Sequence, residues 1–155
     1  MRCLAGFARK AVLAVAMLAL AAVIASGCGK KAAPQKSEEE RVAEEALRAA
    51  MQGDGVGFLD LVAPSFLERA RAEMPDADPE TLGAVLLAGF AENIPYADAS
   101  NLLFEVSTEG DRSVVHVWGD FQDLEGNEMS LGEGQALRVP LRREEGRWYV
   151  DLLDI

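Results

Sequence analysis

The sequence predicts an α+β domain in which N-terminal helices pack on a curved, cone-like antiparallel β-sheet, preceded by a cleaved signal segment. Three observations lead to this prediction. A basic and then apolar leader opens the chain, helical patterns occupy residues 37–92, and alternating strand patterns begin at residue 102. A series of helices followed by a series of strands is typical of α+β domains, whose helices cover one face of an antiparallel sheet.

The first 27 residues have the composition of a secretory signal peptide. Arg2, Arg9 and Lys10 precede an apolar run over residues 11–25, and no acidic residue occurs before Cys28. A basic start, an apolar core of about 7–15 residues and small residues at the exit define such a signal. The run is short for a membrane-spanning helix, which needs about 20 apolar residues.

Cys28 lies where the apolar run ends. Ala25, Ser26 and Gly27 precede it, and this junction resembles the lipobox of bacterial lipoproteins, although leucine is common in that family where Ala25 stands. The resemblance implies cleavage after residue 27 and lipidation of the Cys28 thiol with diacylglycerol, often followed by a further acyl chain such as palmitate. Two or more acyl chains hold a protein stably at a bilayer.

We therefore expect a chain anchored by lipid in a bacterial cell membrane or outer membrane, with its domain on the non-cytoplasmic side. Two alternatives remain open: a plain secreted protein cut by an ordinary signal peptidase, and an uncleaved membrane anchor. Residues 28–36 then form the lipidated cysteine and a flexible tether, and residues 37–155 form one domain.

The chain after the leader is strongly acidic. The leader holds three of the 15 basic residues and none of the 26 acidic ones, which leaves 12 basic and 26 acidic residues, a formal charge of about −14. This charge argues against nucleic-acid binding, which needs clustered Lys and Arg. One histidine and one remaining cysteine argue against a disulfide scaffold and against a His/Cys metal site. We expect no cofactor and no metal.

Four helices are predicted in the first half of the domain. Ser37 and Glu40 form a capping-box pattern at the start of the first helix, and Gly53 supplies its left-handed end. A short second helix opens at Asp54 and stops near Pro64. A second capping-box pattern, at residues 65–68, predicts a third helix that runs to about residue 73.

The fourth helix is predicted to start at Asp78, with Pro79 at the first helical position. Its apolar residues recur at helical spacing, and the expected buried stripe is Leu82, Val85, Leu86 and Phe90. The acidic faces of these helices are interpreted as solvated surface.

Alternating strands follow from Leu102, separated by turns at residues 109–111, 123–127 and 144–146. Short turns between alternating strands predict an antiparallel meander with one packed face. Pro140 predicts an edge position or a bulge, and residues 129–135 fit either a turn or a further short strand. Glu105 and Asp151 are expected outward and solvated. The residues expected to face inward are Phe104, Val106, Val115, Val117, Phe121, Leu137, Val139, Leu141, Trp148, Val150 and Leu152.

Three segments resemble nuclear transport factor two-like cone domains, especially those of small bacterial lipoproteins. They are RVAEEALRAAMQGDGVGFLDLV (41–62), STEGDRSVVHVWG (107–119) and LRREEGRWYVDLL (141–153). The resemblance implies helices over a curved sheet, and in enzymes of this fold an Asp or a His–Asp pair lines the pocket between them. The fold hosts dehydratases, isomerases, transport adaptors and plain ligand binders, and it does not choose among them.

His116 and Asp120 are the candidates for such a pair, because their spacing of four places both on one face of a strand. They alternate with Val115, Val117 and Phe121, so they are expected outside the cone, and only a bulge would reverse this facing. We therefore assign no catalytic residue. Trp148 is interpreted as a core or rim residue, with ligand stacking as the alternative.

The predicted function is that of a membrane-anchored, non-enzymatic domain that binds a small apolar ligand or an envelope protein. The alternative is a periplasmic dehydratase or isomerase that relies on acidic residues in the cone.

Overall fold

The computed structural model describes residues 35–92 and 94–154. The predicted signal peptide, Cys28 and the tether up to residue 34 lie outside these residues. Within the described part, no helix is long and apolar enough to cross a membrane. The elements in chain order are α2 (Glu38–Gln52), α3 (Gly55–Leu59), α4 (Pro64–Glu73), α5 (Pro79–Ala91), β1 (Tyr96–Glu109), β2 (Arg112–Asp123), β3 (Glu128–Leu131), the 3₁₀ helix η1 (Glu133–Gln135), β4 (Leu137–Glu144) and β5 (Arg147–Val150).

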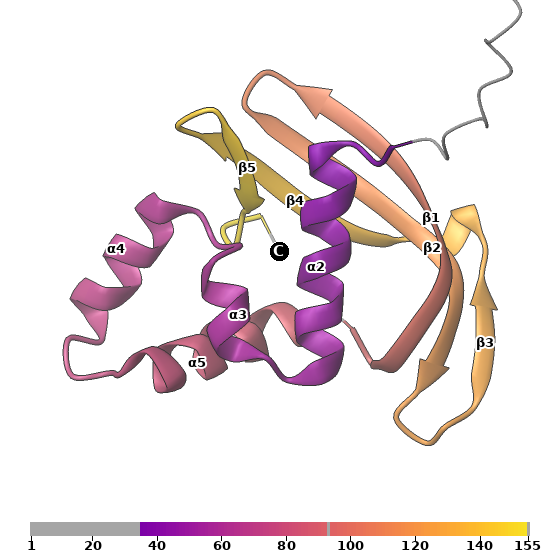
Figure 1. Ribbon diagram of the computed structural model, residues 1–155, viewed down its shortest axis with the longest axis horizontal. Coiled ribbons are helices and arrows are strands. Elements are labelled where there is room, and N and C mark those ends of the chain that lie inside the picture. The colour runs from indigo at the N-terminus through magenta and orange to yellow at the C-terminus, as the bar shows by residue number, and fades with distance from the viewer. Residues whose placement is uncertain (1–34, 93, 155) are drawn as a thin grey trace, which may run out of the picture. The chain divides into compact units, whose positions relative to one another are not determined.

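The predicted α+β class is confirmed, because the helices pack against one side of a curved antiparallel sheet (Figure 1). The strand order is β1-β2-β4-β5, and β3 pairs with β2 as well. β4 pairs with residues 112–117 of β2, whereas β3 pairs with residues 119–122. β2 is thus the central strand, and β1 forms one edge of the sheet.

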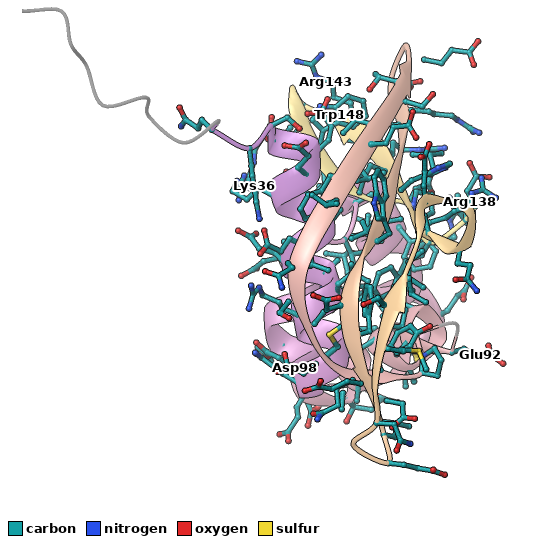
Figure 2. The ribbon with its side chains drawn as sticks, turned by 90° about the vertical axis from the view of Figure 1, so that its right-hand side faces the viewer. Lys36, Glu92, Asp98, Arg138, Arg143 and Trp148 are labelled. Atoms are coloured by element: carbon teal, nitrogen blue, oxygen red, sulfur yellow. The ribbon has the colours of Figure 1, made fainter. Side chains whose placement is uncertain are left out.

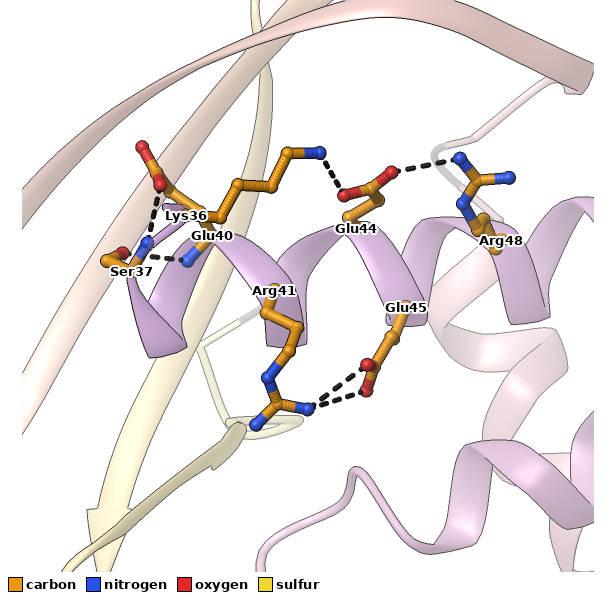
Figure 3. Close-up of polar contacts among 7 residues, drawn as sticks. All are labelled: Lys36, Ser37, Glu40, Arg41, Glu44, Glu45 and Arg48. Carbon is orange, nitrogen blue, oxygen red and sulfur yellow. Dashed lines mark hydrogen bonds and ion pairs between the residues drawn. The ribbon is translucent and has the colours of Figure 1, made fainter. Parts of the chain in front are cut away.

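α2 begins and ends as the sequence predicts. The Ser37 hydroxyl accepts from the Glu40 amide at 3.1 Å, and the Glu40 carboxylate accepts from the Ser37 amide at 2.7 Å (Figure 3). Gly53 ends the helix with φ 68°, a left-handed conformation that glycine adopts without steric cost. Ion pairs within Figure 3, such as Arg48 with Glu44 at 2.9 Å, lie on the solvated face of α2.

Two helix predictions are wrong in detail. α4 begins at Pro64 rather than at Ser65, because the fixed φ and missing N–H of proline suit the first helical position. Ser65 therefore does not cap the helix, and its amide and hydroxyl donate to the Glu144 carboxylate. In α5, Val85 is 50 % exposed and Leu87 is buried instead, because the face turned to the core follows Leu82, Leu86, Leu87 and Phe90.

α3 and α5 cross at direct backbone contact. A Cβ atom added to Gly83 would lie 2.3 Å from the Gly55 carbonyl oxygen, and one added to Gly55 would lie 2.6 Å from the Gly83 carbonyl carbon. Neither position has room for a side chain. The two glycines therefore set how closely α3 approaches α5.

β1 begins at Tyr96, six residues before the predicted start at Leu102. Register shifts between Tyr96 and Asp98 and between Ser100 and Leu103 interrupt its pairing with β2, so residues 96–101 show no simple alternation. Asn101 has φ 50° at the second irregularity. A bulge of this kind bends a strand and hides it from a period-two pattern.

The core lies between the helices and the sheet. The largest fully buried side chains, drawn from helices and strands alike, are Leu47, Phe58, Val62, Val115, Val117, Val139, Leu141 and Val150. The α3–α4 connection also extends the sheet, since the Val150 amide donates to the Leu61 carbonyl at 2.7 Å. The predicted inward positions on β2, β4 and β5 are confirmed.

Three predictions for the second half can be judged individually. Residues 128–131 form a short strand, as one of the two options for this segment predicted. Pro140 pairs with Val114 of β2 in an unbroken register, and its carbonyl accepts from the Asp151 amide at 2.9 Å, so the prediction of an edge position or a bulge is wrong. Asp151 is not solvated: it is 3 % exposed and bonded to Arg142 Nε at 3.2 Å, because the chain turns back after Val150.

Candidate functional site

The centre of the cone is filled by side chains. Leu47 of α2 and Val115 and Val117 of β2 are each at most 1 % exposed. The recess between α2 and β1 has a volume of about 30 Å³. That volume accommodates about one water molecule, whereas ligand pockets span about 300–1,000 Å³. The recess beside α2 is therefore too small for a ligand, and the hollows of ligand size lie elsewhere in the domain.

An open hollow lies over β1, β2 and β3, and we name it the acidic hollow. Its volume is about 460 Å³, and its lining is Asp98, Ala99, Ser100, Asp120, Phe121, Gln122, Glu128, Met129 and Ser130. The strand register assembles it, because Ser100 pairs with Asp120 and Asp120 pairs with Ser130. Side chains directly opposite each other on paired strands lie within contact distance.

Asp120 is the best-ordered carboxylate in the acidic hollow. Its Oδ2 atom accepts from Asn101 Nδ2 at 2.8 Å, and Oδ1 accepts from the Ser130 hydroxyl. The hydrogen bond from Asn101, and then that from Ser130, hold the pKa of Asp120 below its ordinary value. The group is thus stabilised as an anion, which suits contact with a cationic group better than proton donation.

His116 and Asp120 do not form a pair. His116 lies opposite Glu105 and Arg138 across the sheet, whereas Asp120 bonds to Asn101 and Ser130. No hydrogen bond joins His116 to Asp120 in the described chain. The bulge at Asn101 lies on β1, so the alternation of β2 continues unbroken and Val115, Val117 and Phe121 stay buried. The prediction that both polar residues lie outside the cone is confirmed.

The three carboxylates of the acidic hollow do not converge on one point. Within residues 35–92 and 94–154, no group of three or more His, Cys, Asp or Glu side chains has the spacing of a metal site. Asp98 and Glu128 instead flank Gln122 on the two neighbouring strands. The arrangement offers separate negative charges along a surface.

A second hollow, which we name the α4–α5 groove, is lined by apolar side chains and by polar groups in about equal measure. Its volume is about 300 Å³, and its lining is Phe66, Val85, Leu86, Gly89, Phe90, Glu92 and Leu152. Val85, which lines the groove, is 50 % exposed. Exposed apolar surface of this kind suits contact with a protein or an apolar ligand.

Trp148 belongs to the core rather than to a ligand surface. It is 5 % exposed, and the Arg143 guanidinium lies 5.7 Å from its ring centre. Figure 2 shows Trp148 and Arg143 at one end of the domain and Asp98 toward the other. The interpretation of Trp148 as a core or rim residue is confirmed. Sequence reasoning missed the acidic hollow. The hollow forms because polar residues of β1, β2 and β3 lie opposite one another in the sheet, and no local sequence motif reveals that pairing.

No protein-family model matches this chain, and neither does any curated protein. Three solved structures are similar to it. A SEC-C motif containing protein from Rhodopseudomonas palustris shares 19 % identity over 75 % of this chain and 78 % of its own, with a TM-score of 0.44.

The other two similar structures are NTF2-like proteins, where NTF2 denotes nuclear transport factor two. One, from Campylobacter jejuni, is named as a candidate NTF2-like transpeptidase and shares 16 % identity over 74 % of this chain and 97 % of its own, with a TM-score of 0.46. The other, from Burkholderia pseudomallei, shares 17 % identity over 77 % and 95 %, with a TM-score of 0.37. All three TM-scores are below 0.5.

Proposed function

We propose that this chain is a lipid-anchored bacterial envelope protein whose domain binds a partner protein and catalyses no reaction. The packed centre of the cone is the observation that supports the absence of catalysis. Leu47, Val115 and Val117 are each at most 1 % exposed and leave no room for a substrate between α2 and β2. Partner binding is supported by the α4–α5 groove and the acidic hollow, which both open outward.

The anchor is proposed at Cys28 on the strength of the leader and the small residues before it. A domain of charge about −14 is repelled by anionic lipid headgroups, so the acyl chains and not the surface would hold it. The tether of residues 28–36 spans at most roughly 30 Å when extended. The domain is then confined beside the bilayer, where a second envelope protein can meet it.

Metabolic labelling with a fatty-acid analogue, followed by intact-mass measurement, tests the anchor. Wild type and Cys3→Ala should both carry the label and enter the detergent phase, because Cys3 lies in the cleaved leader. Cys28→Ala should carry none and stay in the aqueous phase. A wild-type chain without label, or a labelled Cys28→Ala chain, contradicts the anchor.

Photo-crosslinking in the anchored full-length chain tests partner binding. A crosslinker replaces Val85 in the α4–α5 groove or Leu103 on β1, both about half exposed. A discrete protein adduct from at least one position is expected, and a crosslinker at exposed Glu73 on α4 serves as the control. Adducts absent from both positions, or equal at all three, contradict a specific protein partner.

A dehydratase or isomerase acting at the acidic hollow is the alternative, favoured by the ordered carboxylate of Asp120 in a hollow of about 460 Å³. That enzyme would lose turnover in Asp120→Asn and keep it in Val85→Ser. The binding protein shows the opposite pattern: Val85→Ser reduces the crosslinking yield, and Asp120→Asn leaves it unchanged. Substrate turnover that depends on Asp120 would replace our proposal by this alternative.

A further inference from the structure

We propose that the free edge of β1 binds an extended, basic polypeptide segment by strand addition; this rests on the proposed function as a partner-binding domain. β1 is the last strand of the sheet on its side. In the described residues, every backbone hydrogen bond of β1 to another segment goes to β2. An unpaired strand edge presents N–H and C=O groups on which another strand can form.

The part of the edge suited to pairing is well defined. From Leu103 to Glu109 the register with β2 runs without a shift, whereas the irregularities near Ala97 and Asn101 disrupt the strand before it. At about 3.3 Å per residue, this regular edge is roughly 23 Å long. That length is enough for a partner strand of ordinary size.

Several features that usually prevent strand addition are missing from residues 103–109. Natural edge strands are protected by charged side chains, especially Lys, and by Pro or bulges; the charged side chains of this stretch are glutamates only. The sequence of β1, YADASNLLFEVSTE, contains no Lys, Arg or Pro. On the outer face of the sheet the regular edge instead displays Leu103, which is 56 % exposed, followed by the exposed Glu105, Ser107 and Glu109.

Charge complementarity selects the occupant. A second copy of this chain brings a second edge with the same two glutamates and the same negative net charge, and two strongly acidic domains repel each other. A basic segment places opposite charges beside both glutamates and an apolar side chain beside Leu103. Read along an antiparallel partner, the outer-face pattern is basic-x-x-x-basic-x-apolar.

The inner face of the edge adds a second selection. The Lys36 ammonium lies 4.8 Å from the centre of the Phe104 ring, on the side of β1 that faces α2 (Figure 2 labels Lys36). The Lys36 ammonium is paired with the Glu44 carboxylate. The inner face of the regular edge consists of Phe104, Val106 and Thr108, so nothing on that face calls for a basic partner residue. The preferred segment therefore carries its basic residues on one face only, which distinguishes it from a uniformly basic tail.

The test uses two labelled peptides, Lys-Thr-Ser-Thr-Lys-Thr-Leu-Thr and its counterpart with both lysines replaced by glutamate. Fluorescence anisotropy with the folded chain should show binding of the lysine peptide and at least about tenfold weaker binding of the glutamate peptide. Hydrogen exchange should slow at alternate amides of residues 103–109 when the lysine peptide is bound, since only outward N–H groups gain partners.

Variants link the binding to this edge. Glu105→Gln with Glu109→Gln removes two exposed carboxylates and should weaken the lysine peptide about five- to tenfold. Glu68→Gln with Glu73→Gln makes the same charge change on α4 and should leave the affinity within about twofold. Thermal melting should be unchanged in both pairs, because all four side chains are exposed.

Three outcomes overturn the inference. Equal affinity for the two peptides would contradict the selection by charge. Binding of the lysine peptide without slowed hydrogen exchange on β1 would contradict strand addition. Slowed exchange on β1 that needs no peptide and grows with protein concentration identifies a second copy as the occupant. If any of these outcomes occurs while a crosslinker at Val85 still captures a protein, only the inference about the β1 edge fails. If crosslinkers at Val85 and Leu103 both give no adduct, the proposed function fails as well.

Discussion

The two halves of β2 have different neighbours and different roles. In the first half, residues 112–117, the strand lies between β1 and β4, and Ser113, Val115 and Val117 are at most 2 % exposed. In the second half, residues 119–123, β3 replaces β4, and the side chains of Asp120 and Gln122 line the acidic hollow. One strand therefore contributes to the core at one end and presents polar surface at the other.

Gly119 marks the change between the halves. Its φ of 147° and its contact with the bulge on β1 leave no space for a side chain, since a Cβ atom would lie 2.7 Å from the Asn101 carbonyl oxygen. Beyond it, Phe121 is buried, with its ring centre 4.7 Å from that of Tyr96. The second half thus keeps a small apolar contact of its own while its other face stays polar.

The largest contrast should appear when one apolar side chain is truncated beside each half. Leu141→Ala, on β4 opposite Ser113, should lower the free energy of unfolding by about 2–5 kcal/mol because it leaves a cavity in a fully buried site. Met129→Ala, on β3 opposite Phe121 and 40 % exposed, should cost less than about 1 kcal/mol. Urea unfolding measures both, and equal losses would contradict the division of β2.

The junction itself gives the next largest effect. Gly119→Ala should destabilise the domain by about 1–3 kcal/mol, because the added methyl group meets the β1 backbone and the φ value is unfavourable for alanine. Gly132→Ala is the matched control, since no atom lies within 4 Å of its added Cβ and its φ is ordinary. An unchanged melting temperature of Gly119→Ala would show that the backbone at the β1 bulge can move to make room for the methyl group.

Within β2, acid should act on the polar half. The pKa of Asp120 is lowered by hydrogen bonds from Asn101 and Ser130, and that of Asp123 by bonds from Asn127. A lowered folded-state pKa gives stability that is present above the unfolded value of about 3.9 and lost as the pH falls through the folded value. Urea midpoints of wild type and Asp120→Asn should therefore differ at pH 7 and converge at acidic pH. A difference between the two urea midpoints that grows as the pH falls would contradict a lowered pKa of Asp120 in the folded state.

The smallest effect is local to one carboxyl group. Asn101→Ala removes the main hydrogen bond to Asp120 and should raise its pKa toward the ordinary value while leaving that of Asp123 unchanged. Asn127→Ala should raise the pKa of Asp123 and leave that of Asp120 unchanged, because it removes the hydrogen bond that the Asn127 side chain donates to Asp123 at 2.9 Å. Carboxyl titrations followed by NMR measure both, and a response of both groups to either change would contradict separate networks.

Local signals explain why most of the fold could be predicted. Ser37, Gly53 and Asp78 cap helices through contacts with residues three or four positions away, so the sequence alone reveals them. Alternation identified the core positions of β2, β4 and β5 because one face of those strands is buried. The start of β1 was missed because bulges remove the alternation, and the burial of Asp151 was missed because it depends on a turn after the last strand.

The candidate site was less predictable for a physical reason. The acidic hollow exists only because Asp120 pairs with Ser100 on one side and Ser130 on the other, and strand register is a non-local property. The sequence drew attention to Asp120 through its spacing from His116, a partner it does not contact. The free edge of β1 likewise follows from strand order and has no sequence motif.

The central claim is that the cone is filled and that binding occurs on its outside, and xenon pressurisation of crystals tests this most directly. Apolar cavities of about 150 Å³ take up xenon, whereas close-packed interiors do not. Our account predicts no xenon between α2 and the sheet. Xenon bound among Leu47, Val115 and Val117 would contradict it and would restore an internal ligand or substrate site.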